Sequence, residues 1–66
     1  MNSIILNDKP IQSSATTVDE LIEEQKINRM FLAIMVNNEI IAKSEWDKIA
    51  LQDNDKVDIY SPVGGG

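Results

Sequence analysis

The apolar segment 31–36 constrains the fold of this chain more than any other stretch. It reads Phe, Leu, Ala, Ile, Met and Val without a polar interruption. A continuous apolar run of this length is typical of a strand covered on both faces, although a buried helical segment looks similar. Its β-branched residues and the pair Asn37-Asn38, which can adopt positive φ, favour a strand with a short return strand over residues 39–41. A second layer must therefore pack on the sheet.

A helix over residues 18–26 is expected to supply that layer. Apolar residues recur at the spacing of one helical face and form its buried stripe: Val18, Leu21 and Ile22. Thr17 and Glu20 have the spacing of a capping box, with the carboxylate reaching back to the Thr17 N–H. The helix should end near Lys26, with Asn28 as its stop. Three carboxylates lie outside this stripe and are interpreted as a solvated face, with a role in docking a partner as the alternative: Glu20, Glu23 and Glu24.

Two shorter elements precede and follow these. Residues 4–6 and 11–12 are predicted to pair as a β-hairpin around the turn-forming segment 7–10. Ser44 is expected to cap a short second helix of one or two turns. That helix carries Trp46 inward, and we expect its indole N–H to donate to a carbonyl.

The last predicted strand covers residues 56–60. Its alternation places two apolar residues inward: Val57 and Ile59. Pro62 ends it, because proline donates no ladder hydrogen bond. Asp53 and Asp55 precede the strand with the spacing of the first calcium ligands, but the rest of that pattern fails. They are interpreted as turn residues, and no metal site is predicted.

Two absent residue types argue against catalysis. The chain of 66 residues has neither Cys nor His, so it lacks a thiolate nucleophile, the commonest general base and the commonest transition-metal ligand. The formal net charge of −5 argues against binding to nucleic acid or to an anionic membrane. It favours a basic protein partner, although it could equally serve solubility alone. No apolar run approaches the roughly 20 residues that span a bilayer, and no signal peptide is recognised, so a cytoplasmic location is expected.

The last three residues are all glycine: Gly64, Gly65 and Gly66. Glycine has no side chain to pack and loses much backbone freedom on ordering, so this tail contributes nothing to a core. It suits a slim arm that carries the Gly66 carboxylate into a narrow cleft of another protein. The alternative is a frayed end or a remnant of cloning.

The chain resembles the ThiS family of sulfur carriers, within the ubiquitin-like β-grasp superfamily. The resemblance covers nearly the whole chain in ordered segments: 4–8, 17–22, 36–41, 44–46, 53–57 and the final Gly65-Gly66. It implies an α+β fold with a mixed sheet of four to five strands on one main helix and a short second helix. Residues 1–62 would form the β-grasp domain and 63–66 a flexible tail. The family usually ends in two glycines after a bulkier residue, so Gly64 should lengthen the arm without removing its chemistry.

The resemblance also implies a mechanism in which this chain is a co-substrate rather than an enzyme. An E1-like adenylating enzyme, similar to ThiF, would use ATP and Mg²⁺ to adenylate Gly66. A sulfur donor such as a cysteine desulfurase would convert the adenylate to a thiocarboxylate, with Gly64 and Gly65 as spacer. A thiazole synthase similar to ThiG would then take the sulfur for the thiazole of thiamine. This chain itself would bind no cofactor.

The docking surface is predicted from alternation in the apolar run. Three residues are expected to face the helix: Leu32, Ile34 and Val36. Phe31, Ala33 and Met35 would then share the opposite sheet face with Ile5 and Tyr60. The residues predicted to dock partners are Ile5, Phe31, Met35, Tyr60, Pro62 and Val63. Two alternatives remain open: a homodimer that covers this face, and a register inverted by one residue.

Three other functions remain open at this point. The chain could carry sulfur for molybdopterin or another metabolite, although those carriers resemble a longer chain. It could be a ubiquitin-like modifier whose Gly66 becomes attached to a lysine of another protein. It could also be a passive binding module, since fold does not fix function.

Overall fold

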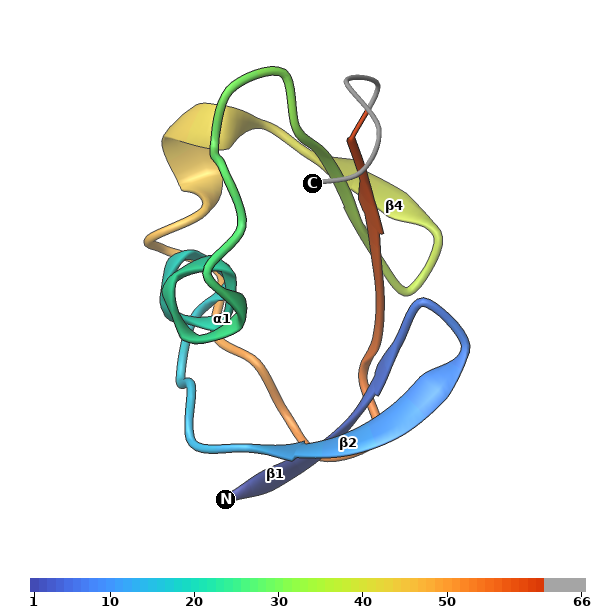
Figure 1. The fold of residues 1–66 in the computed structure, drawn as a ribbon. Coiled ribbons are helices and arrows are strands. Elements are labelled where there is room, and N and C mark those ends of the chain that lie inside the picture. The colour runs from blue at the N-terminus through green and yellow to red at the C-terminus, as the bar shows by residue number, and fades with distance from the viewer. Residues whose placement is uncertain (62–66) are drawn as a thin grey trace.

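A computed structural model of the protein describes residues 1–61. Five strands, one α-helix and one 3-10 helix follow in order: β1 (Asn2–Leu6), β2 (Lys9–Ser13), α1 (Val18–Gln25), β3 (Ala33–Val36), β4 (Glu39–Ile41), η1 (Lys43–Glu45) and β5 (Lys56–Tyr60). Figure 1 shows the sheet at its edge, with α1 packed across one face. The expected mixed sheet on one main helix is confirmed, and the short second helix is a 3-10 helix.

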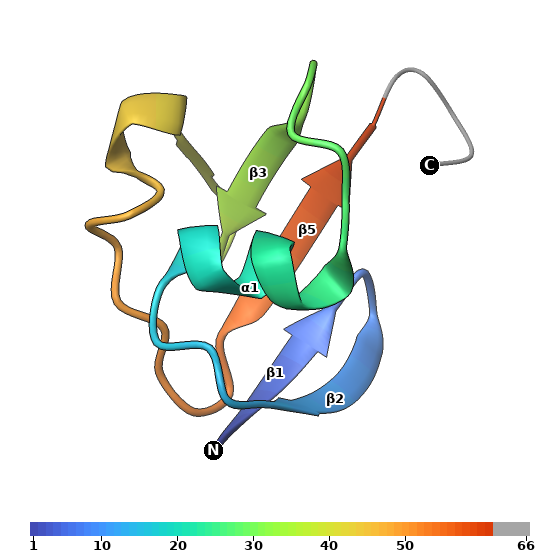
Figure 2. The same ribbon diagram turned by 60° about the vertical axis from the view of Figure 1, so that its left-hand side comes forward.

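The last strand of the chain lies at the centre of the sheet. The strand order is β2-β1-β5-β3-β4, so β5 separates the two hairpins. It runs parallel to β1 and antiparallel to β3, as Figure 2 shows. The fold therefore closes only when residues near the C-terminus insert between two hairpins formed earlier in the chain.

The core lies between the sheet and α1. Six apolar side chains are fully buried there: Ile4, Val18, Leu21, Ile22, Ile34 and Val57. Each such side chain contributes roughly 1.5–3 kcal/mol on leaving water. The alternation predicted for β3 is confirmed, because Ile34 and Val36 are buried and Leu32 packs against the core. The predicted start of this strand is wrong: it begins at Ala33, and Phe31 lies in the preceding turn with φ 62°.

The helix begins as predicted, but its capping carboxylate binds a different residue. The Thr17 hydroxyl accepts the Glu20 N–H at 3.2 Å. The Glu20 carboxylate accepts the N–H and hydroxyl of Thr16, each at 2.8 Å, rather than the N–H of Thr17. At the other end Lys26, not Asn28, adopts the left-handed conformation that ends the helix. Its N–H donates to the Glu23 carbonyl at 3.1 Å, as in a Schellman motif.

A second glutamate of α1 holds the end of β2. The Glu24 carboxylate accepts the Ser13 hydroxyl at 2.6 Å, and the Ser14 hydroxyl and N–H at 3.0 and 3.2 Å. The Ser13 hydroxyl in turn accepts the Ala15 N–H at 3.0 Å. Glu20, Glu23 and Glu24 are exposed, as predicted. In addition, the Glu20 and Glu24 carboxylates fasten the β2–α1 connection to the helix.

The segment after β4 is built around the single tryptophan. Trp46 is buried, and its indole N–H donates to the Ile41 carbonyl at 3.2 Å, as predicted. The predicted cap at Ser44 is wrong, because Ala42 occupies the N-cap position and gives no side-chain hydrogen bond. The chain instead turns through a backbone bond from the Glu45 N–H to the Ala42 carbonyl at 2.8 Å.

Both β-hairpins close through asparagine turns with positive φ. Asn7 and Asp8 (φ 48° and 68°) join β1 to β2, and Asn37 and Asn38 (φ 51° and 69°) join β3 to β4. Two-residue loops of this kind match the twist of the flanking strands. Pro10 follows the first turn in the edge strand β2, opposite Ile5. At that non-hydrogen-bonded position its nitrogen faces away from β1, so no ladder bond is lost.

We predict that the stability of the fold falls in acid through Glu24. Hydrogen bonds from Ser13, and then from Ser14, hold the pKa of its carboxyl below the ordinary glutamate range. Its contribution to the free energy of unfolding is therefore present above the ordinary value of about 4.3 and is lost as pH falls through the lower, folded value. Glu24→Gln should lower stability at pH 7, and the difference from the wild type should shrink as the pH falls through the lowered pKa of Glu24, as measured by urea unfolding.

Glu39→Gln provides the charge-matched control. Glu39 is exposed in β4, and no hydrogen bond to its carboxylate occurs among residues 1–61. An equal change of pH dependence in both variants would show that the lost charge, not the serine contacts, is responsible.

Candidate functional site

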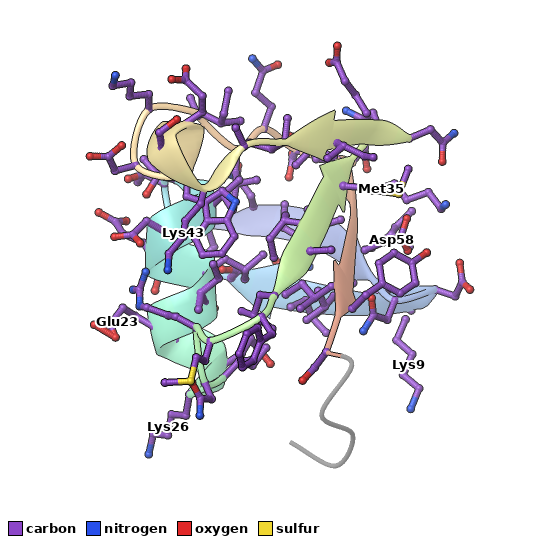
Figure 3. The ribbon with its side chains drawn as sticks, turned by 90° about the horizontal axis from the view of Figure 1, so that it is seen from above. Lys9, Glu23, Lys26, Met35, Lys43 and Asp58 are labelled. Atoms are coloured by element: carbon purple, nitrogen blue, oxygen red, sulfur yellow. The ribbon has the colours of Figure 1, made fainter. Side chains whose placement is uncertain are left out.

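The face of the sheet away from α1 carries a group of partly exposed apolar side chains. Strand pairing places Met35 beside both Ile40 and Asp58, and Ala33 beside Tyr60. Figure 3 shows Met35 and Asp58 on the side opposite α1. We call this surface the open sheet face; its residues are Ile5, Ala33, Met35, Ile40, Lys56, Asp58 and Tyr60. Among them, Ile40 and Tyr60 are 75% and 55% exposed.

A buried carboxylate lies in the middle of this face. Asp58 is only 7% exposed, although it points away from the helix as predicted. The Lys56 ammonium donates to its carboxylate at 3.2 Å, and this contact raises the pKa of Lys56. A carboxylate with so little access to water needs such a partner. The open sheet face therefore combines an apolar surround with one neutralised ion pair at its centre.

The end of β5 is fixed from both sides. Ala33 pairs with Tyr60, the last strand residue. On the other side the Asn7 side chain bonds to Ile59: its Oδ1 accepts the Ile59 N–H at 2.8 Å, and its Nδ2 donates to the Ile59 carbonyl at 3.3 Å. We call these two hydrogen bonds the Asn7 bridge. The position at which the chain leaves the sheet, after Tyr60, is thus fixed by contacts from β3 and from Asn7.

The predicted sulfur attachment site lies six residues after the end of β5 in the sequence. Gly66, the spacer residues Gly64 and Gly65, and the predicted docking residues Pro62 and Val63 all lie outside the described residues. The predicted boundary between domain and tail at residues 62 and 63 lies outside them as well.

The loop before β3 presents two large apolar side chains to solvent. Met30 and Phe31 are 61% and 68% exposed. Polar contacts hold the loop: Arg29 forms an ion pair with Asp19 on α1, and the Met30 N–H donates to the Asn28 side chain at 2.9 Å. Positive φ at a bulky residue such as Phe31 is uncommon and costs roughly 1–2 kcal/mol.

This loop lies at the same end of the sheet as the end of β5. Since β3 and β5 are antiparallel and Ala33 pairs with Tyr60, the residues just before Ala33 lie at the same end of the sheet as Tyr60. Figures 1 and 2 show this loop and the last residues of β5 at that end. Of the predicted docking residues, Ile5, Met35 and Tyr60 therefore share the open sheet face, whereas Phe31 adjoins its end from the loop.

Besides Met1, two exposed apolar residues were missed by the sequence-based prediction of the docking surface: Met30 and Ile40. Met30 directly precedes the apolar run, and Ile40 alternates with the partly buried Ile41. Extending the run by one residue would have included Met30. Applying strand alternation to residues 39–41 would have placed Ile40 opposite the core.

Metal-ligand clusters and pockets are absent from the described part of the chain. Among residues 1–61, no three Cys, His, Asp or Glu side chains are placed to hold a metal ion, and this region has no pocket. Within the same residues, no helix has the length and apolar character to cross a membrane. The described residues present three surface features that bear on function: the open sheet face, the Met30–Phe31 loop and the end of β5.

The chain and its fold are similar to known proteins. It is 30% identical over 64 residues to the sulfur carrier protein ThiS of Escherichia coli (strain K12), covering 96% of this chain and 97% of that protein. The whole chain is 32% identical to a segment that makes up 20% of the thiazole synthase of Paramagnetospirillum magneticum (strain ATCC 700264 / AMB-1).

A solved structure has the same fold. The crystal structure of the thiamine biosynthesis protein (ThiS) from Geobacter metallireducens superposes with a TM-score of 0.82 at 24% identity, covering 97% of this chain and 99% of that one. The fold is thus the ThiS-like β-grasp, as the sequence resemblance implied. The model of the ThiS family matches residues 4–66, through the last glycine. With nearly every residue matched, the chain belongs to the ThiS family.

Proposed function

We propose that this protein carries sulfur for the thiazole of thiamine as a thiocarboxylate on Gly66. The family match that runs through Gly66 carries this proposal. The relative from Escherichia coli, which is named as a sulfur carrier and is nearly equal in length, supports it. The fold fits the role, because the strand that leads to the glycines is held on both sides up to Ile59 and on the β3 side up to Tyr60.

The chemistry requires activation of a poor acyl donor. The Gly66 carboxylate attacks the α-phosphate of ATP, pyrophosphate leaves, and an acyl-adenylate forms. Hydrosulfide then attacks the acyl carbon and AMP leaves, which gives the thiocarboxylate. With a persulfide donor an acyl disulfide forms first; a thiol attacks the donor sulfur, forms a disulfide with it and releases the thiocarboxylate. Glycine suits the acyl position because no side chain obstructs the approach of sulfur.

The catalytic groups for these steps come from partner enzymes. The chain has no Cys or His, so the sulfur donor, such as a cysteine desulfurase, is a separate protein. An adenylating enzyme similar to ThiF supplies the ATP site and the Mg²⁺ that neutralises the phosphates. In this scheme the protein is a co-substrate, and its reactive group is its own terminal carboxylate.

The proposed recipient of the sulfur is a thiazole synthase. The similar segment in Paramagnetospirillum magneticum is part of a longer chain with that name. Joining a carrier and its recipient in one chain raises the effective concentration of each for the other, commonly into the millimolar range. Such a fusion supports a direct encounter between the two activities.

The proposed docking surface is the open sheet face together with the Met30–Phe31 loop. Both adjoin the end of β5, so a partner that takes up the residues after Tyr60 would cover them at the same time. Exposed aromatic residues are enriched among those that dominate binding energy. Phe31 and Tyr60 are the exposed aromatic side chains of residues 1–61.

The proposed function makes a prediction about the attachment site, Gly66. Incubation with the cognate adenylating enzyme, ATP and a sulfur donor should raise the intact mass by the difference between sulfur and oxygen. Removal of Gly65 and Gly66 together should abolish this change. Removal of one glycine, which leaves a Gly-Gly end, should retain it. An unchanged mass for the full chain would contradict the proposal, and covalent adducts with other proteins in cell extract would favour a modifier instead.

A prediction at Phe31 distinguishes an effect on partner docking from an effect on folding. Phe31→Asn removes the exposed ring but keeps a residue type that tolerates positive φ. The free energy of unfolding should stay the same or rise by up to about 1 kcal/mol, because strain is relieved. The KM for this protein in the adenylation reaction should rise about tenfold, as expected for loss of an interface anchor.

Gln25→Ala, on the exposed side of α1, is the control and should leave both quantities near wild type. Equal KM values for Phe31→Asn and wild type would remove Phe31 from the docking surface.

A further inference from the structure

The Asn7 bridge replaces a stretch of β-ladder with a side chain. The parallel pairing of β1 and β5 covers Ile5 and Leu6, and the Asn7 N–H adds a bond to the Val57 carbonyl at 2.9 Å. In an evenly spaced parallel ladder the next acceptor, for the Ile59 N–H, would be the Asn7 carbonyl. The positive φ of Asn7 turns the backbone away, and its Oδ1 accepts that N–H instead.

The bridge lies one residue before the end of the strand. Its second bond, from Asn7 Nδ2 to the Ile59 carbonyl, satisfies the other backbone group on the same side. Beyond Ile59, β5 continues only to Tyr60, which pairs with Ala33 on the opposite side. On the β1 side, the Asn7 side chain is therefore the last contact before the chain leaves the sheet.

We propose that Asn7 is a positioning residue for sulfur loading, which rests on the proposed function of Gly66. The bridge fixes where the segment after Tyr60 starts. Residues 61–66 can span at most about 20 Å when fully extended. If β5 frayed back to Val57, the partner would have to order additional residues, and each costs roughly a factor of 5 to 30 in the equilibrium. Because the Asn7 bridge holds Ile59 in the sheet, the partner enzyme does not have to order these residues when it binds.

The opposite end of the same strand provides a matched comparison. Asn37 also has positive φ in a two-residue turn, and its Oδ1 accepts the Lys56 N–H at 3.0 Å. Its Nδ2 donates to the Asp55 carboxylate at 3.0 Å. Both asparagines thus accept a backbone N–H of β5 through Oδ1, but Asn37 holds the first residue of the strand and Asn7 holds the last but one. If both side chains served only to stabilise the fold, removing either one should have the same effect on stability and on kcat/KM.

The test compares three glycine variants in the complete chain: Asn7→Gly, Asn37→Gly and Asp8→Gly. Glycine keeps the positive φ and removes the side chain. Asp8→Gly reports the effect of glycine in the Asn7 turn alone. The measurements are urea unfolding, hydrogen exchange at the Ile59 amide, and kcat/KM for thiocarboxylate formation with the cognate adenylating enzyme and sulfide, followed by intact mass.

Asn7→Gly and Asn37→Gly should lose similar stability. Only Asn7→Gly should speed exchange at Ile59 in native conditions and lower kcat/KM about tenfold, whereas Asn37→Gly and Asp8→Gly stay within about twofold of wild type. Asn7→Asp, which keeps the acceptor for the Ile59 N–H, should retain about a third of the activity, and it replaces Asn7→Gly if that variant does not fold.

The inference would be overturned if the Asn7 and Asn37 variants lost kcat/KM equally, or if the Asn7 variant lost none. In either case, thiocarboxylate formation by the wild type would still uphold the proposed function. Absence of conversion in the wild type would instead overturn the proposed function itself.

Discussion

The structure depends on the insertion of β5 between β1 and β3. This strand contributes Val57 and Ile59 to the core and forms the only parallel pairing among the five strands. It also leads to the glycines on which the proposed chemistry occurs. One strand therefore completes the fold and positions the functional segment, so changes that weaken its pairing affect both.

The polar residues of this small protein act mainly as fasteners between segments. Glu20 and Glu24 hold the β2–α1 connection, Arg29 holds the loop before β3, and Asn7 and Asn37 hold the two ends of β5. Chains of this size bury a modest share of their surface, so satisfied hydrogen bonds at the ends of elements matter for a unique structure. In the loop before β3 these polar contacts leave Met30 and Phe31 free to face solvent.

Sequence patterns predicted the elements better than the contacts between them. Periodicity found the helix over Val18–Gln25 and the inward residues Ile34 and Val36, because these depend on neighbours within one element. The turn at Phe31 was missed because it results from polar contacts of the loop, which an apolar run does not reveal. The Asn7 bridge joins residues 52 apart in the sequence. It was missed because the positive φ of a hairpin turn is already a sufficient reason for asparagine at position 7. The docking role of the surface and the chemistry of Gly66 came from resemblance alone.

The edges of the sheet bear on how such a protein behaves when crowded with copies of itself. Pro10 turns a nitrogen without hydrogen toward the outer side of β2, and β4 at the other edge has only three residues. Neither edge strand is therefore a good template for pairing with a strand of a second molecule, and this disfavours assembly of the protein into fibrils. In the proposed function, the protein would be released by one enzyme before it meets the next, and a monomeric carrier suits that transfer.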